Sequence, residues 1–209
     1  IRLYDVESES KEGAFLDTIS RADEREIKRL YNVQLSEFSL VPETPLSYSI
    51  PSEVRHLHDT NLKIDADVAN IEGESISTVA QGLATGNNDR FLRKHWESVS
   101  DNFRPYAKGG ADAWIIPPAV HTVNFNDGGR EIRAAGRARF QNSQFYEKEG
   151  LSWTYIKDTG RRFGYLPEGY VFDVAGSMVF PKENYSSWRL MSVLNSDLYH
   201  CLFLSLTPE

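Results

Sequence analysis

Cysteine is nearly absent from this chain of 209 residues, in which Cys201 is the only one. A single cysteine excludes a disulfide framework and any zinc site built from several thiolates. Long hydrophobic runs are missing as well. The most apolar stretch, residues 190–206, is interrupted by polar side chains, whereas a membrane-spanning helix needs about 20 apolar residues in succession. We therefore expect a cytoplasmic protein without a membrane segment.

An initiating methionine and a recognisable signal peptide are also missing. The chain begins at Ile1, so we expect it to be a fragment or a processed piece of a longer protein. With 40% hydrophobic, 12% aromatic and 25% charged residues, its composition is that of an ordinary globular protein with one sizeable core or two small ones.

The common motifs of catalysis and nucleotide binding are absent. The sequence has no G-x-x-x-x-G-K-[ST] phosphate loop, no G-x-G-x-x-G dinucleotide turn and no G-x-S-x-G nucleophile elbow. None of its five histidines belongs to an H-E-x-x-H pair. His56 and His58 are two residues apart, a spacing that does not converge on one ion on a helix. We interpret each histidine as an ordinary core or surface residue and predict neither a catalytic nor a metal site.

Charge is distributed unevenly along the chain, whose formal net charge is -7. Residues 1–80 hold 8 Lys and Arg against 16 Asp and Glu, whereas residues 81–170 hold 13 against 10. A basic, aromatic-rich middle beside an acidic flank favours one nucleic-acid-facing surface on an acidic body. A solvated basic face without any partner is the alternative interpretation.

The hydrophobic periodicity predicts an α+β fold, with a mixed or antiparallel sheet of short strands in the middle and helices near both ends. We divide the chain into a helical or extended connector, residues 1–60, and a main domain, residues 61–209. Helices are predicted over 9–31 and 191–203, with a short one starting at Ser52, and strands over 46–50, 120–125 and twice within 163–172.

Three glycine-bearing loops followed by basic residues are the most informative feature of the middle region. Their glycines let backbone N–H groups approach an anion. Asparagine offers a donor and an acceptor to a base edge, and arginine reads guanine in the major groove. Three structural turns with solvated basic neighbours are the alternative. The loops and their basic neighbours are Thr85, Gly86, Asn87, Asn88, Arg90 and Arg93; Lys108, Gly109 and Gly110; and Asn126, Asp127, Gly128, Gly129, Arg130, Arg133, Arg137 and Arg139.

These residues resemble a known family. Residues 81–91, Gln-Gly-Leu-Ala-Thr-Gly-Asn-Asn-Asp-Arg-Phe, look like the signature that opens the target-recognition region of large adenine-specific DNA methyltransferases. The resemblance is to the methyltransferases of BREX phage-defence systems (PglX type), which are related to single-chain restriction–modification enzymes. Other matching runs occur in the family's order and cover nearly the whole chain: residues 14–16, 45–49, 105–110, 126–133, 149–154, 166–177 and 194–196.

The resemblance implies a segment that recognises a short asymmetric DNA site on behalf of a methyltransferase. The family's S-adenosylmethionine loop and its N-P-P-[YF] motif, which holds the flipped adenine, are not present here. The one Pro-Pro pair, Pro117-Pro118, follows Ile116. We therefore expect this segment to be non-catalytic and to bind no cofactor, with S-adenosylmethionine held by a catalytic domain elsewhere in the parent enzyme.

The resemblance also implies roles for individual residues in binding double-stranded DNA. Backbone amides at Thr85-Gly86 and Gly109-Gly110 would hold phosphates with the help of Arg90, Arg93 and Lys108. Asn87, Asn88, Asn126 and Arg133 would add contacts, and Arg130, Arg137, Arg139 and Arg161 would read bases. Trp153 and Tyr155 are interpreted as core residues, with groove contacts as the alternative. After Gly110 the chain departs from the family, because Ala111-Asp112-Ala113-Trp114 replace an arginine and several aromatics.

A second hypothesis treats the segment as a protein-docking module. Its acidic first third would bind the catalytic domain or other subunits of a defence complex, and the segment in isolation would not bind DNA. A small-molecule enzyme is a third and less favoured hypothesis, because the sequence offers no nucleophile–base pair and no metal ligands.

Overall fold

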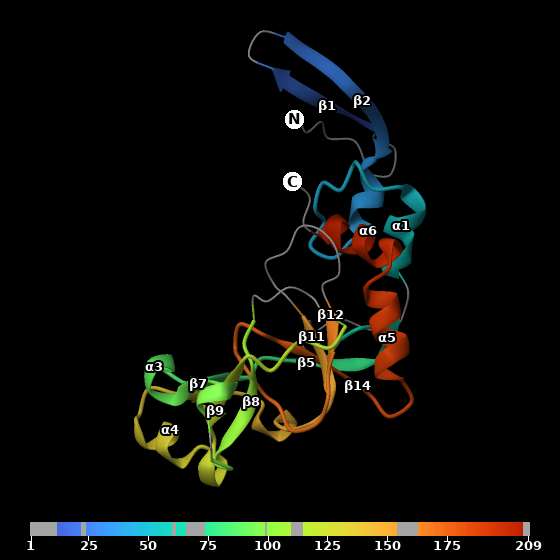
Figure 1. Ribbon diagram of the computed structural model, residues 1–209. Helices are drawn as coiled ribbons and strands as arrows, with labels where there is room; N and C mark the ends of the chain where they lie inside the picture. Colours follow the sequence, from blue (N-terminus) through green and yellow to red (C-terminus); the bar gives the residue numbers. More distant parts are fainter. Residues whose placement is uncertain are drawn as a thin grey trace. The chain divides into compact units, whose positions relative to one another are not determined.

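The computed structural model describes residues 12–21, 24–59, 62–65, 74–98, 100–109, 115–153 and 163–206. The chain forms two compact units. The smaller unit combines residues 1–61 with residues 196–209, and the larger unit is Leu62–Asn195. Short strands, most of them antiparallel, occur together with helices (Figure 1), which confirms the predicted α+β class. None of the described helices is long and apolar enough to cross a membrane.

The smaller unit contains a β-hairpin where the sequence predicted a helix over residues 9–31. Strands β1 (Glu12–Arg21) and β2 (Glu24–Gln34) are antiparallel, and their register places Leu16 opposite Leu30. The helical spacing of the apolar residues did not reveal the hairpin, because few of them lie opposite one another across it: Leu16 is opposite Leu30, but Ile19 is opposite Glu26. Pairing between strands is a long-range effect that overrides local periodicity. Residues 9–11 lie outside the described part of the chain.

Arg55 organises the rest of the smaller unit. The predicted helix start at Ser52 is confirmed by α1 (Ser52–His56), which packs against η2 (Leu35–Leu40) and α6 (Asp197–Leu206), with η3 (Leu57–Asp59) following. Arg55 is 3% exposed and donates to Glu37 and to the carbonyls of Ser47 and Ile50. The strand predicted over 46–50 is therefore wrong, since these carbonyls serve Arg55 in a turn and not a neighbouring strand.

Two four-stranded sheets form the larger unit. The first has the order β12-β11-β14-β5 and is antiparallel throughout. The second has the order β13-β8-β9-β7 and is parallel only between β13 and β8. The strands are β5 (Ser77–Ala80), β7 (Leu92–Lys94), β8 (Phe103–Ala107), β9 (His121–Asn124), β11 (Gly150–Trp153), β12 (Phe163–Leu166), β13 (Val171–Phe172) and β14 (Met178–Pro181).

Smaller elements complete the larger unit. Two short pairs of strands accompany the sheets: a parallel pair, β3 with β4, and an antiparallel pair, β6 with β10. These elements are β3 (Leu62–Lys63), β4 (Glu74–Ser75), β6 (Leu83–Ala84), α3 (Asn88–Phe91), η4 (His95–Glu97), η5 (Asn126–Gly128), α4 (Arg130–Ala134), β10 (Arg139–Phe140), η6 (Ser143–Phe145) and α5 (Ser187–Leu194).

The strand predictions in this unit hold, but the pairing of the strands was not foreseen. Strand β9 confirms the strand predicted over 120–125, and β12 and β13 confirm the two predicted within 163–172. These last two strands do not pair with each other. Strand β12 pairs with β11 in the first sheet and β13 with β8 in the second, so the turn between them passes from one sheet to the other.

One hydrophobic core joins the two sheets. It contains Val123 of β9 and Tyr106 of β8 from the second sheet and Leu166 of β12 and Met178 of β14 from the first. The Tyr106 hydroxyl donates to the carbonyl of Leu83 at 2.7 Å, which ties β6 to this core. Segments that carry the predicted DNA-binding residues are thus anchored on one packed interior.

Trp153 and Tyr155 were interpreted as core residues, with DNA-groove contacts as the alternative, and the structure describes the first of them. The ring of Trp153 is half-buried and stacks on Phe163, with 6.0 Å between ring centroids, so it is packed on one side without belonging to the buried core. Tyr155 lies outside the described residues.

The helix predicted over residues 191–203 is wrong in its extent, because two helices occupy this region. Helix α5 ends at Leu194 and α6 begins at Asp197. At the break, the side chain of Asn195 donates to the carbonyl of Phe163 at 2.9 Å and accepts from its N–H at 3.1 Å. This bidentate contact holds the end of α5 on strand β12, and a local pattern could not reveal it.

Candidate nucleic-acid interface

The first glycine loop is held together by its own polar side chains. Thr85 is buried, and its hydroxyl donates to the side-chain oxygen of Asn88 at 2.6 Å. The side-chain oxygen of Asn87 accepts from the N–H of Arg90 at 3.0 Å and so caps the first turn of α3. These three polar groups shape the loop from within. Residues 86–90 are all exposed, so Gly86, both asparagines, Asp89 and Arg90 face solvent.

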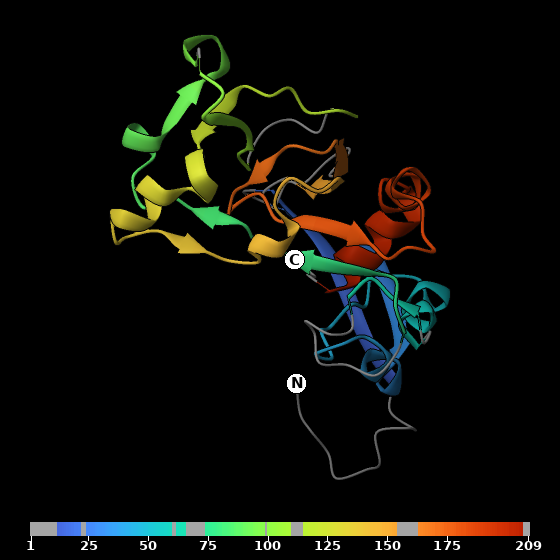
Figure 2. The same cartoon turned by 90° about the horizontal axis from the view of Figure 1, so that it is seen from below.

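Gly86 lies against a segment that is distant in the sequence. Its φ of 72° is in the left-handed region, and a Cβ added there would stand 2.7 Å from the carbonyl oxygen of Arg137. Strand β6, in green, lies beside β10, in yellow, next to this contact (Figure 2). Their register places Ala84 opposite Arg139. Glycine is therefore required for both conformation and space, and the loop is fastened to the segment that holds Arg137 and leads into β10, which begins at Arg139.

Among the residues predicted to bind DNA, Arg137 and Arg139 have exposed side chains that make the fewest contacts within the described part of the chain. They flank Ala138, which packs against the core, so the alternation of an extended segment directs both guanidinium groups outward. Both residues are exposed. Within the described part of the chain, neither guanidinium makes a hydrogen bond or an ion pair. Both groups are thus available for a ligand.

Helix α4 brings two more predicted arginines to the same region. Arg133 lies over the ring of Phe140, with 3.6 Å between its guanidinium carbon and the ring centroid. Arg130 is exposed and forms an ion pair with Asp127 at 3.1 Å, which is worth little in water. Asn126 is half-buried and belongs to the η5 turn. The carbonyl of Asn126 accepts from the N–H of Gly129.

The arginines of α3 and β7 are exposed but contact nearby groups. The guanidinium carbon of Arg90 lies 5.0 Å from the centroid of the Phe91 ring. Arg93 donates to the carbonyls of Asp89 and Leu92 at 3.0 and 2.6 Å, which covers the end of α3. We name these side chains the arginine cluster; its members, on α3, β7, α4 and the segment of β10, are Arg90, Arg93, Arg130, Arg133, Arg137 and Arg139.

The second glycine loop packs against a different segment from the one that the first loop contacts. Lys108 and Gly109 follow β8 and pack beside the loop after β13, where a Cβ on Gly109 would stand 2.2 Å from the carbonyl oxygen of Ala175. Lys108 itself is exposed. Gly110 and Arg161, which the sequence also placed in the interface, lie outside the described residues.

His121 and Lys94 form a contact that the sequence analysis missed. Lys94 on β7 is directly opposite His121 on β9, and Lys94 Nζ lies 2.9 Å from His121 Nε2. Burial and the charges of Lys94 and Lys108 lower the pKa of His121. The alternation over 120–125 predicted the strand. The proximity of the three basic residues could not be predicted without knowing which strand pairs with β9.

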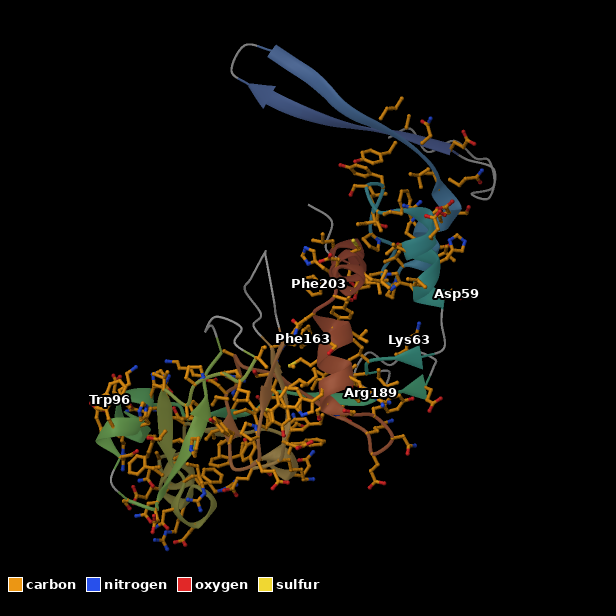
Figure 3. All side chains as sticks on the ribbon, turned by 45° about the vertical axis from the view of Figure 1, so that its right-hand side comes forward. Asp59, Lys63, Trp96, Phe163, Arg189 and Phe203 are labelled. Atoms are coloured by element: carbon orange, nitrogen blue, oxygen red, sulfur yellow. The ribbon has the colours of Figure 1, made fainter. Side chains whose placement is uncertain are left out.

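Trp96 is a second residue whose exposure was not predicted. It is 65% exposed on the η4 turn, and its ring meets the His95 ring edge-on with 4.9 Å between centroids. Figure 3 shows it at one end of the larger unit, with Arg189 of α5 at the other. Among the described residues, no group of three His, Cys, Asp or Glu side chains is placed to hold a metal ion.

Two proteins of named activity share sequence with this chain. The adenine-specific methyltransferase BrxX of Escherichia coli O9:H4 (strain HS) is 33% identical over 130 residues, which cover 56% of this chain and 11% of BrxX. The adenine-specific methyltransferase PglX of Lacticaseibacillus casei (strain Zhang) is 23% identical over 232 residues, which cover 99% of this chain and 18% of PglX. The chain is related to adenine-specific methyltransferases of the BREX type.

This relation confirms the general part of the predicted resemblance. No protein-family model matches the chain. The chain spans less than a fifth of the length of either methyltransferase. What this segment contributes to such an enzyme therefore has to be argued from its own surface.

Proposed function

We propose that this chain is a DNA target-recognition segment of an adenine-specific methyltransferase used in phage defence. The observation that carries the proposal is the pair Arg137 and Arg139, two exposed guanidinium groups that have no partner in the described part of the chain and lie on a segment held against a glycine loop. Arginine side chains on a rigid support suit sequence recognition, because the planar fork can donate two hydrogen bonds to guanine O6 and N7. The similarity to BrxX and PglX supports the part of the proposal that concerns an adenine-specific methyltransferase.

The geometry suggests a division of work within the arginine cluster. Arg137 and Arg139, which have no partner among the described residues, are proposed to read bases. Arg90, Arg93 and Arg130, which already contact neighbouring groups, are proposed to lie along the phosphate backbone with the exposed backbone of Gly86. Asn87 and Asn88 shape the loop and are proposed to act only through it.

The rest of the reaction is proposed to belong to other parts of the parent enzyme. S-adenosylmethionine binding and methyl transfer would take place in a catalytic domain, and this segment would place the target adenine within reach of that domain. A base must leave the duplex before it can be methylated. A segment that binds the flanking base pairs would hold the duplex while the adenine is extruded.

A salt-titrated binding assay with random-sequence duplex DNA tests the proposal. The logarithm of the association constant should fall linearly with the logarithm of salt concentration, with a slope of roughly 0.9 per phosphate contact. On a sequence selected from the random pool, the double variant Arg137→Ala/Arg139→Ala should bind more weakly by tenfold or more, since each base contact is worth about 1–3 kcal/mol of discrimination. Arg189→Ala removes an exposed arginine of α5 and is the matched control.

Three outcomes separate the hypotheses. If the double variant loses selectivity for a sequence selected from the random pool while Arg90→Ala lowers affinity equally for all sequences, the division of work is supported. If Arg189→Ala weakens binding as much as the double variant, the effect is general charge and the assignment is wrong. Absence of binding at low salt, together with capture of a catalytic domain by residues 1–80, would favour the docking hypothesis.

A further inference from the structure

Three basic side chains act on one another at the margin of the second sheet, two of them on neighbouring strands and one just after β8. Lys94 on β7 is opposite His121 on β9, and His121 is opposite Tyr106 on β8. Lys108 lies just after β8, where its N–H donates to the carbonyl of Tyr106 at 3.1 Å, and its charge acts on His121. We name Lys94, His121 and Lys108 the basic triad. It joins two stretches that are far apart in the sequence.

The triad concentrates positive charge that no described carboxylate neutralises. Glu97 accepts from the backbone N–H of Lys94 at 2.8 Å and not from its ammonium group. Asp173, which follows β13, is buried and accepts from the N–H of Ala175 at 3.0 Å. Within the described residues, neither Lys94 nor Lys108 forms an ion pair.

The contact between Lys94 and His121 fixes the state of the imidazole. An ammonium group can only donate, so Nε2 of His121 accepts and carries no proton, and the ring is neutral. Burial and the two lysine charges lower the pKa of His121 and keep the ring in this state. The residue opposite His121 on β8 is Tyr106, whose hydroxyl donates to the carbonyl of Leu83.

We propose that the basic triad binds one backbone phosphate of the DNA and that His121 takes up a proton when it does so. This inference rests on the proposed function. A phosphate placed between Lys94 and Lys108 would draw the ammonium of Lys94 away from Nε2 and would offset both lysine charges. Protonated His121 then becomes a third donor to the same anion. By linkage, DNA binds more tightly at a pH where this proton is available.

The phosphate group itself is tested first, with inorganic phosphate as the probe. The imidazole resonance of His121, identified by its loss in His121→Asn, is followed by NMR through a pH titration of the 209-residue chain. Phosphate should move its midpoint to higher pH, and sodium chloride at equal ionic strength should move it less. In Lys94→Gln the phosphate effect should shrink, whereas in Lys182→Gln, which removes an exposed lysine elsewhere in the larger unit, it should persist. Equal midpoints in phosphate and chloride would overturn the site.

DNA as the source of the phosphate is tested by binding at two pH values, 8.0 and 5.5. Each unit by which DNA raises the pKa of His121 corresponds to about tenfold in affinity, so wild type should bind several-fold more tightly at the lower pH. His121→Asn should lose that part of the pH dependence, and Lys182→Gln should keep it. Salt-dependent binding with the same pH dependence in His121→Asn would overturn the inference and leave the proposed function standing. A phosphate effect in a chain that does not bind DNA would exclude DNA as the source and count against the proposed function.

Discussion

The guanidinium carbon of Arg133 lies 3.6 Å from the centroid of the Phe140 ring. This contact joins α4 to β10, and Phe140 also stacks near Phe125, with 6.5 Å between ring centroids. Arg133 is therefore a structural residue as well as a member of the arginine cluster. Arg137, four residues later, is exposed and has no partner among the described side chains. Two arginines that look alike in the sequence thus have different consequences when removed.

We expect Arg133→Ala to lower the free energy of unfolding by about 1 kcal/mol, in line with an exposed cation–π contact and its packing. Arg137→Ala should change it by less than about 0.5 kcal/mol, as is usual for surface positions. Urea denaturation of both variants measures the difference, and the DNA-binding assay shows whether both also lose affinity. Equal stability of the two variants would show that the stacked geometry contributes nothing in solution.

Gly86 and Gly136 offer a matched test of how tightly the first loop is held. Both have φ of 72°, but a Cβ on Gly86 would stand 2.7 Å from the Arg137 carbonyl oxygen, whereas a Cβ on Gly136 would meet no atom within 4 Å. Gly136→Ala should lower the free energy of unfolding by about 1–2 kcal/mol, the backbone effect alone. Gly86→Ala should lower it further and, by displacing the 137–139 segment, should weaken DNA binding.

Thermal and urea unfolding of the two glycine variants, followed by DNA titration of each, provide the measurement. The comparison is informative because the backbone strain is common to both, so the difference reports the contact with Arg137. If Gly86→Ala is no less stable than Gly136→Ala, the loop is not clamped to β10 as described. The proposed support for Arg137 and Arg139 would then be lost.

Local patterns predicted three strands of the larger unit and the start of α1 in the smaller one, but not the other strands. The strand over 120–125 and the two strands within 163–172 were found, because each is a short apolar run bounded by turn residues. The hairpin of β1 and β2 was predicted as a helix, since its apolar residues recur at helical spacing, whereas the hairpin depends on pairing between two strands, such as that of Leu16 with Leu30.

The candidate site shows the same limit. The glycine loops and their arginines could be picked out by residue type alone. Their roles could not, because the partner of Gly86 is the carbonyl of Arg137 and the partner of His121 is Lys94. Both contacts arise from strand pairing between distant segments. A histidine with no motif around it offers no signal until its neighbours across the sheet are known.

In the smaller unit, we expect Arg55→Ala to be strongly destabilising. Arg55 is buried and donates to Glu37 and to the Ser47 carbonyl at 3.1 Å each. Its removal leaves those acceptors without a donor. Removing one partner of a buried ion pair lowers the free energy of unfolding by about 3–5 kcal/mol. Arg104→Ala, which breaks the exposed pair of Arg104 and Glu147, should lower the free energy of unfolding by at most about 1 kcal/mol. Urea denaturation compares them, and similar losses would contradict the burial of Arg55.

Folding stability should depend on pH through His121. Burial and the charges of Lys94 and Lys108 lower its pKa in the folded chain, whereas an unfolded histidine titrates near 6.5. Above about pH 6.5 the ring is neutral in both the folded and the unfolded chain, so His121 does not reduce the free energy of unfolding there. As the pH falls below 6.5 toward the lower folded pKa, the unfolded chain binds a proton that the folded chain does not, so the free energy of unfolding decreases.

The difference between wild type and His121→Asn isolates this contribution from that of other histidines. Urea denaturation at pH 8.0 and pH 5.5 should show a larger loss of stability on acidification in wild type than in His121→Asn. Lys94→Gln should fall between them, because one of the two repelling charges is removed while burial remains. Added phosphate should reduce the acid-induced loss in wild type if it stabilises the protonated ring. The same pH dependence in all three proteins would mean that His121 is neither buried nor crowded by cations in solution, and the basic triad would not exist as a unit.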